Sequence, residues 1–161
     1  MASPVKDHAP HHLSLLFRVH GRLCALPLEH VVETMRPLPM DAVAGAPACV
    51  AGVSIIRGAA IPVVDVARLL TPSDDSGRIG PPVGSARFVT VRVTDRTVAL
   101  AVDVVVGVRR LPPGALHALP LLLRDAGSDA VATIGTLDAE LLLVLRAARL
   151  VPSDLSAEAA P

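Results

Sequence analysis

The chain has 161 residues, of which 52% are hydrophobic, and its formal net charge is zero. That length suffices for one domain or for two small ones that share a core. A chain without net positive charge has no overall attraction for a phosphate backbone, which argues against nucleic acid as a partner. Uncharged apolar stretches stay below the ~18 residues that a spanning helix needs, and the first residues lack the apolar centre of a signal peptide. We therefore expect a cytoplasmic protein without direct membrane insertion.

The N-terminal half begins with a polar tail and continues with strand patterns. Residues 1–12 predict a disordered tail, and the histidines of His8–His12 lack fixed further ligands, so we expect no metal site there. From Leu15 to His20, apolar residues 15, 17 and 19 alternate with polar residues 18 and 20, which is typical of a half-buried strand. Gly21-Arg22 predicts a turn into a returning strand. Glu29–Met35 predicts a helical turn that runs into a further strand.

The segment Val50–Leu70 contains two apolar runs separated by Arg57-Gly58, and it ends in a short amphipathic piece. Glycine allows a turn with positive φ, and the permanently charged Arg57 needs a partner or water. Asp65 is the second ionisable group within this apolar segment. The two charges indicate a binding corner. The Pro-, Gly- and Ser-rich residues 71–85 then predict a linker.

The chain also repeats itself. Residues 17–26 align without gaps with residues 91–100, and residues 63–70 align with residues 144–151. Two matching blocks in the same order indicate a duplicated unit. We expect a first barrel over residues 13–70 and a second over residues 86–151, each closed so that no long edge stays open. In this alignment Asp65 matches Arg146 and Arg57 matches Asp138, so the Arg-Gly corner is expected in the first barrel alone.

Enzymatic chemistry finds little support in the chain. Phosphate-binding, dinucleotide-binding and nucleophile-elbow motifs are absent, and the acidic residues and histidines are scattered. Cys24 and Cys49 form no CxxC motif, and we expect buried reduced thiols. A groove between two barrels would instead suit an amphipathic helix that presents apolar anchors and an acidic group. A small all-β enzyme with an unrecognised site is the alternative.

Several motifs resemble, in order and spacing, those of the CheW-like family of bacterial chemotaxis coupling proteins, over roughly residues 15–151. The matching features are Phe17, Leu26-Pro27-Leu28, Val31-Val32-Glu33, Gly52-Val53, Arg57-Gly58, Pro62-Val63-Val64-Asp65 and residues 102–108. The resemblance implies an all-β fold of two five-stranded, SH3-like barrels around a shared hydrophobic core, with short helical segments. The CheW-like domain would span residues 13–152, followed by a tail over residues 153–161.

The resemblance also implies a function. The protein would be a non-catalytic adaptor without cofactor or metal, which joins the cytoplasmic tips of methyl-accepting chemotaxis proteins to the regulatory domain of the histidine kinase CheA. Glu33 and Arg57 would form a polar pair beside the receptor groove. The implied receptor- and kinase-binding residues are Val31, Val32, Glu33, Gly52, Arg57 and Gly58. For Gly52 and Gly58 a purely conformational role is an equal alternative.

The chain departs from the family pattern at three places. Ile55-Ile56 stands where the corner usually reads Asn-Leu, Val104 stands at a position that is often acidic, and Arg146 replaces an aspartate after the closing strand. These departures favour a specialised coupling protein, and a system that controls pili or a second messenger is the alternative to a flagellar one. A detached regulatory domain of the CheA type is a further alternative.

Overall fold

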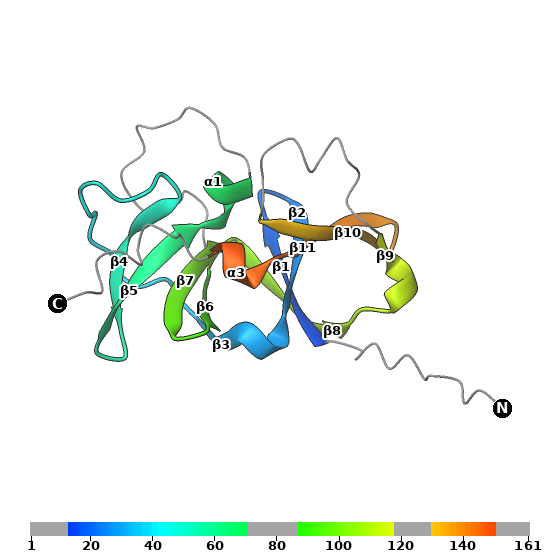
Figure 1. Cartoon of the computed structure of the whole chain (residues 1–161), viewed down its shortest axis with the longest axis horizontal. Coiled ribbons are helices and arrows are strands. Elements are labelled where there is room, and N and C mark those ends of the chain that lie inside the picture. The colour runs from blue at the N-terminus through cyan, green and yellow to red at the C-terminus, as the bar shows by residue number, and fades with distance from the viewer. Residues whose placement is uncertain (1–12, 71–86, 118–129, 151–161) are drawn as a thin grey trace.

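A computed structural model of the chain describes residues 13–70, 87–117 and 130–150, which form two β-sheets with a few short helices (Figure 1). The predicted tails, the histidine cluster and the linker lie outside the described residues. The first part of the chain contains β1 (Leu13–Val19), β2 (Arg22–Pro27), the 3₁₀ helix η1 (Leu28–His30), β3 (Val31–Met35), β4 (Val50–Ile56), β5 (Ala59–Asp65) and α1 (Val66–Leu70). The second part contains β6 (Arg87–Val93), β7 (Arg96–Val102), β8 (Val104–Arg110), η2 (Pro113–Ala115), β9 (Leu116–His117), β10 (Val131–Leu137), β11 (Glu140–Leu145) and α3 (Ala147–Leu150).

The strands form sheet A, in the order β8-β1-β2-β11-β10-β9, and sheet B, in the order β3-β6-β7-β5-β4. An antiparallel hairpin lies inside each sheet, β1–β2 in sheet A and β6–β7 in sheet B. The second strand of each hairpin pairs in parallel with a strand from the other part of the chain, β11 in sheet A and β5 in sheet B. The predicted all-β class with short helical segments is therefore confirmed.

The internal repeat is confirmed strand for strand. β1, β2 and β3 correspond to β6, β7 and β8, and β4, β5 and α1 correspond to β10, β11 and α3. Equivalent strands also occupy equivalent places in the order of the two sheets. The gapless sequence alignment thus reflected first strands of 7 residues, β1 and β6, that each lead through a two-residue turn into the second strand.

The predicted barrel boundaries do not describe the sheets. Sheet A takes β1 and β2 from the first half of the chain and its other strands from the second half, whereas sheet B takes β6 and β7 from the second half. The two halves exchange their first hairpins. A repeat in the sequence defines equivalent units, but it cannot say whether a hairpin pairs within its own unit or with the other one.

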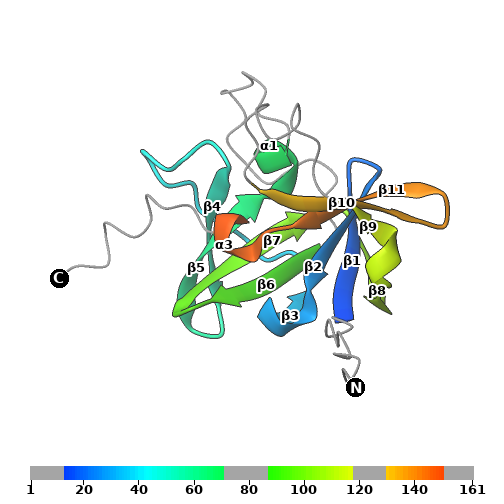
Figure 2. The ribbon, with the colours of Figure 1, turned by 45° about the vertical axis from the view of Figure 1, so that its right-hand side comes forward.

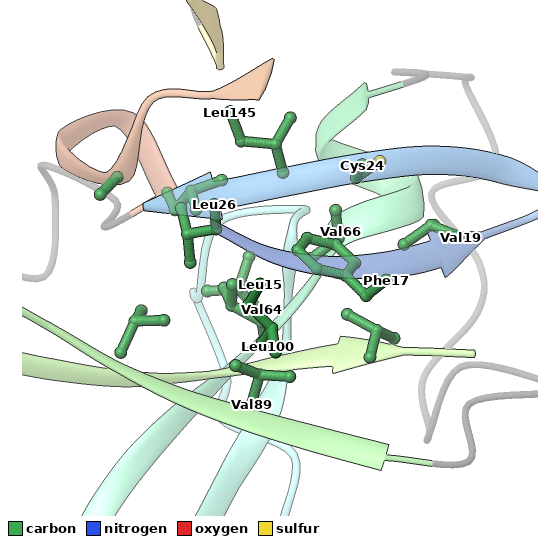
Figure 3. Close-up of a cluster of buried hydrophobic side chains, with 14 of the residues drawn as sticks. Leu15, Phe17, Val19, Cys24, Leu26, Val64, Val66, Val89, Leu100 and Leu145 are labelled. Carbon is green, nitrogen blue, oxygen red and sulfur yellow. The ribbon is translucent and has the colours of Figure 1, made fainter. Parts of the chain in front are cut away.

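Three clusters of buried side chains hold the sheets together. The first lies between the sheets and unites Phe17, Leu26, Val64 and Leu100, among others (Figure 3). The second contains Leu16, Ala25 and Leu142 and belongs to sheet A, and the third contains Phe88, Val63 and Ala99 and belongs to sheet B. The expected shared core is therefore present. Leu15, Phe17 and Val19 of β1 belong to the first cluster and Leu16 belongs to the second, so this strand is buried on both faces. Its alternating sequence pattern had predicted that only one face would be buried.

Candidate functional site

The turn between β4 and β5 is a tight two-residue connection formed by Arg57 and Gly58, with φ of 50° and 80°. A turn with positive φ at both central residues matches the right-handed twist of the strands. Glycine is common in such turns because it adopts positive φ without steric cost. A Cβ built on Gly58 would meet nothing within 4 Å, so the dihedral angle and not the available space favours glycine. Gly58 is exposed, and its conformational role is evident.

Arg57 forms a two-point ion pair with Glu33 of β3. Its Nε donates to Oε1 and its Nη2 donates to Oε2, both at 2.7 Å. The expected contact between these residues is confirmed. The guanidinium lowers the pKa of the Glu33 carboxyl below its ordinary value by hydrogen bonding, and Glu33 raises the pKa of Arg57. Since 78% of the Arg57 side chain is exposed, the pair holds a fixed positive group at the surface.

This ion pair also joins the two ends of sheet B. In the strand order, β3 is at one end and the β4–β5 hairpin is at the other. A salt bridge between them requires the sheet to curl until its ends meet. We define Arg57, Gly58 and Glu33 as the Arg57 corner.

The apolar surroundings of this corner come from a β-bulge and from β4. Val31 pairs with Val91 and Glu33 pairs with Thr90, so Val32 is the extra residue on β3. Val31 is half-buried against the shared core, whereas 57% of Val32 is exposed. Ile55, just before the turn, is 65% exposed. Exposed aliphatic side chains therefore occur next to Glu33 in β3 and two residues before Arg57 in β4.

Gly52 has a structural role. It is buried, and a Cβ at this position would lie 2.7 Å from the carbonyl oxygen of Asp41. Asp41 and Val53 exchange two backbone hydrogen bonds along the outer edge of β4. The absence of a side chain lets this loop cover the edge strand.

Asp65, expected to mark the binding corner together with Arg57, lies at the other end of β5. Its Oδ1 accepts a hydrogen bond from the backbone N–H of Ala67, and its Oδ2 lies 3.2 Å from Nε of Arg68. Only 5% of Asp65 is exposed. The aspartate caps α1 and belongs to the packing of the fold, so the interpretation of the two charges as one corner was wrong.

A second ion-paired corner, which was not predicted from the sequence, lies at the β10–β11 turn. Asp138 and Ala139 have φ of 49° and 64°, and Asp138 Oδ2 accepts from Nη1 of Arg109 on β8 at 3.1 Å. We define these three residues as the Asp138 corner. It links the edge strand β8 to the β10–β11 hairpin of sheet A as the Arg57 corner links β3 to the β4–β5 hairpin of sheet B, with the charges reversed. The corner is therefore a repeated feature, contrary to expectation, and the alignment of Arg57 with Asp138 was the signal.

Strand β8 adds exposed aliphatic side chains that were not among the predicted binding residues. Val104, Val106 and Val108 are each about half exposed, at 52%, 49% and 49%. Val106 occupies the same place in β8 as Val32 does in β3, because both are the bulged residues of equivalent strands. The exposed Val32 of sheet B thus has an equivalent exposed valine, Val106, on sheet A.

Three further features of the described residues concern metal binding, membrane crossing and the state of the thiols. Within these segments, no group of three or more His, Cys, Asp or Glu could hold a metal ion, and no helix is long and apolar enough to cross a membrane. Neither Cys24 nor Cys49 is part of a disulfide; Cys24 is buried, as expected, and Cys49 is half-buried. Burial raises the pKa of Cys24 to about 12, so its thiol is protonated at neutral pH.

Two sheets of equivalent topology, with fixed ions and exposed aliphatic side chains at their corners, define a protein of the CheW two-subdomain β class. The CheW-like domain family matches residues 14–155, and the chain belongs to this family. The resemblance found in the motifs is thereby confirmed.

Two individual proteins illustrate the similarity. The protein FrzA of Myxococcus xanthus is 33% identical over 117 residues, which cover 72% of this chain and 66% of FrzA, slightly less than two thirds of that relative. The crystal structure of the scaffolding protein TtCheW from Thermoanaerobacter tengcongensis superposes with a TM-score of 0.68 at 20% identity. That match covers 84% of this chain and 88% of TtCheW, and it supports the fold.

Proposed function

We propose that this protein is a non-catalytic adaptor of the bacterial cytoplasm, which couples methyl-accepting chemoreceptors to the histidine kinase CheA in a chemosensory array. Binding two partners at once raises their local concentration, so no bond has to be made or broken. Membership of the CheW-like family supports the adaptor role.

The observation that carries the proposal is the Arg57 corner. Glu33 fixes an exposed arginine, and the exposed Val32 and Ile55 lie near these two residues in β3 and β4. Arginine and apolar side chains are common at the energetic centres of protein interfaces. Val31, Gly52 and Gly58 would support this surface from below, by packing and by backbone conformation. The kinase regulatory domain and the receptor tip are the proposed partners.

The test is co-sedimentation of the purified protein with receptor fragments and CheA. Arg57→Glu replaces the fixed cation by a charge that Glu33 repels, and we expect binding to weaken at least tenfold, since interface hot spots exceed about 1.4 kcal/mol. Arg36→Glu, at an exposed arginine beyond the far end of β3, is the matched control and should bind normally. Equal binding of Arg57→Glu and wild type would refute the site assignment.

A second candidate is a coupling protein of a system that controls pili or a second messenger. The departures from the family pattern favour it, because Ile55, Val104 and Arg146 are all exposed and therefore alter the surface and not the core. In that case the protein should bind the receptors and kinase of such a system and not those of a flagellar one. Parallel co-sedimentation with both sets distinguishes the two candidates.

A further inference from the structure

Two of the three methionines of the chain meet in one cluster of side chains. Met35 ends β3 and pairs with Phe88, and Met40 belongs to the connection between β3 and β4. Both are half-buried, and both pack against the third cluster, which belongs to sheet B. Each methionine therefore combines apolar neighbours with contact to solvent.

Met40 is held against β4 by the residues on either side of it. The carbonyl oxygen of Pro39 accepts a hydrogen bond from Oγ of Ser54 at 2.9 Å. Asp41 and Val53 exchange two backbone hydrogen bonds, of 2.9 and 2.8 Å. In both ribbon views the cyan chain between β3 and β4 lies beside β4, on the side away from sheet A (Figures 1 and 2). We define Pro39, Met40 and Asp41 as the Met40 segment.

The surroundings of the two methionines are apolar. Met40 Cγ lies 3.3 Å from the place where a Cβ on Gly52 would be, so its side chain lies directly over this glycine. The cluster beyond it contains Ile56, Ile61 and Phe88, whose side chains have no hydrogen-bond donor or acceptor. A polar group on either methionine sulfur would find no partner among these side chains, and its desolvation would cost free energy.

Peroxides convert accessible thioethers into sulfoxides, which are polar. The sulfur lone pair attacks one peroxide oxygen, the O–O bond breaks and an S–O bond forms. The transferred oxygen passes its proton to the departing hydroxide, which leaves as water, so sulfur is oxidised and the peroxide is reduced. We propose that Met35 and Met40 form a reversible oxidation site, and that methionine sulfoxide in this cluster releases the Met40 segment from β4. A thiol-dependent methionine sulfoxide reductase reverses the step, with the oxygen leaving as water and two thiols becoming a disulfide.

The oxidation site lies next to both strands of the Arg57 corner. Glu33 precedes Met35 by two residues in β3, and β4, to which the Met40 segment is bound, leads directly into Arg57. Release of the segment opens the outer edge of β4. Oxidation should therefore loosen the corner and weaken partner binding, a consequence that rests on the proposed adaptor function.

Treatment of the full-length protein with hydrogen peroxide tests the site. A Cys49→Ser background removes the half-buried thiol, and N-acetyl-methionine in the same reaction gives the rate of an unhindered thioether. We expect Met35 and Met40 each to be oxidised within about tenfold of that rate, as peptide mass spectrometry measures. A slower reaction at either residue would show that the cluster excludes the oxidant, and it would overturn the proposal.

Amide hydrogen exchange measures the release of the segment. The Val53 amide, which donates to Asp41, should exchange at least about tenfold faster after oxidation, and the reductase should restore the original rate. The control is the variant Met35→Leu, Met40→Leu, which conserves side-chain volume and removes both sulfurs, so peroxide should leave its exchange unchanged. Unchanged exchange in the oxidised parent protein, or an equal increase in the leucine variant, would refute the release.

The oxidation site and the adaptor function fail separately. Oxidation should weaken co-sedimentation of the parent protein with receptor fragments and CheA at least about tenfold, and the leucine variant should bind equally before and after peroxide. A reduced protein that never binds a receptor or kinase would overturn the adaptor function alone, because oxidation and amide exchange are measured without a partner. Full binding by the oxidised parent protein would show that the release does not affect the Arg57 corner, and it would overturn the regulatory consequence.

Discussion

Ala139 follows Asp138 at the tip of the β10–β11 hairpin and is held at φ 64°, where an L-residue with a Cβ is strained. The equivalent position in the other copy of the repeat is Gly58. The two turns thus have the same backbone and differ in the residue that must adopt it.

We expect Ala139→Gly to stabilise the protein by about 0.5–1 kcal/mol, because relief of strain exceeds the entropy that glycine adds to the unfolded chain. Gly58→Ala, at φ 80° and in open space, should destabilise by a similar amount. Urea unfolding of both variants gives the two free energies. If both substitutions shift stability in the same direction, turn conformation is not the cause.

The two thiols should differ sharply in reactivity. Burial raises the pKa of Cys24 to about 12, whereas Cys49 is half-buried. At pH 8 the thiolate fraction of Cys24 is about three orders of magnitude below that of an ordinary cysteine, so one equivalent of a thiol reagent should react quickly and the second only in denaturant. Cys49→Ser should remove the fast phase. Retention of that phase in Cys49→Ser would identify Cys24 as the accessible thiol.

Protonation of Glu33 should weaken the Arg57 corner in acid. The hydrogen bonds from Arg57 lower the pKa of this carboxyl from its ordinary value of 4.5, so the folded protein binds this proton less readily than the unfolded chain does. Its contribution to stability is therefore present above pH 4.5 and is lost as the pH falls through the lower, folded value. The difference in unfolding free energy between wild type and Glu33→Gln should shrink over that range. A difference that stays constant from pH 7 to pH 3 would contradict this.

At the scale of single elements, β4 and β10 each depend on a glycine that allows close backbone contact. A Cβ on Gly52 of β4 would lie 2.7 Å from the Asp41 carbonyl oxygen, and a Cβ on Gly135 of β10 would lie 2.7 Å from that of Ala115. Backbone oxygens cannot rotate away as a side chain can. Gly52 thus lets the Asp41 loop cover the outer edge of sheet B, and Gly135 lets the chain of η2 and β9 approach β10 closely.

We expect Gly52→Ala and Gly135→Ala each to cost about 1–3 kcal/mol, as other overpacked sites do. Gly114, which has open space around its Cβ position and no positive φ, is the control, and Gly114→Ala should be near neutral. Thermal or urea unfolding measures all three. Gly52→Ala that keeps full stability and loses only partner binding would reassign Gly52 to the interaction surface.

At the scale of the whole molecule, the sequence predicted the elements better than their partners. The alternation around Phe17 and Val91, and the turn at Arg57-Gly58, identify strands and hairpins because they depend on neighbours in the chain. The parallel pairing of β2 with β11 joins residues more than a hundred positions apart, and no local pattern encodes it. The Glu33–Arg57 contact was expected from the family resemblance, whereas the Arg109–Asp138 pair was missed because only one side of the repeat had been read as a site.

The exchange of hairpins between the sheets makes the two halves of the chain interdependent. β1 and β2 have their other sheet A partners in the second half, and β6 and β7 pair with β3 and β5 from the first half. A fragment of residues 1–70 would expose the unpaired edges of β2 and β5, together with Phe17, Leu26 and Val64 of the shared core. An isolated half therefore lacks the partners for both of its hairpins.

We expect fragments 1–70 and 71–161 each to remain unfolded when expressed alone, and to form a native-like complex when mixed, because only together do they complete both sheets. Circular dichroism and urea unfolding of each fragment and of the mixture would measure this. Under the sequence-based division into two self-contained barrels, each fragment would instead unfold cooperatively on its own. Cooperative unfolding of the isolated first fragment would therefore favour that division and contradict the exchanged arrangement.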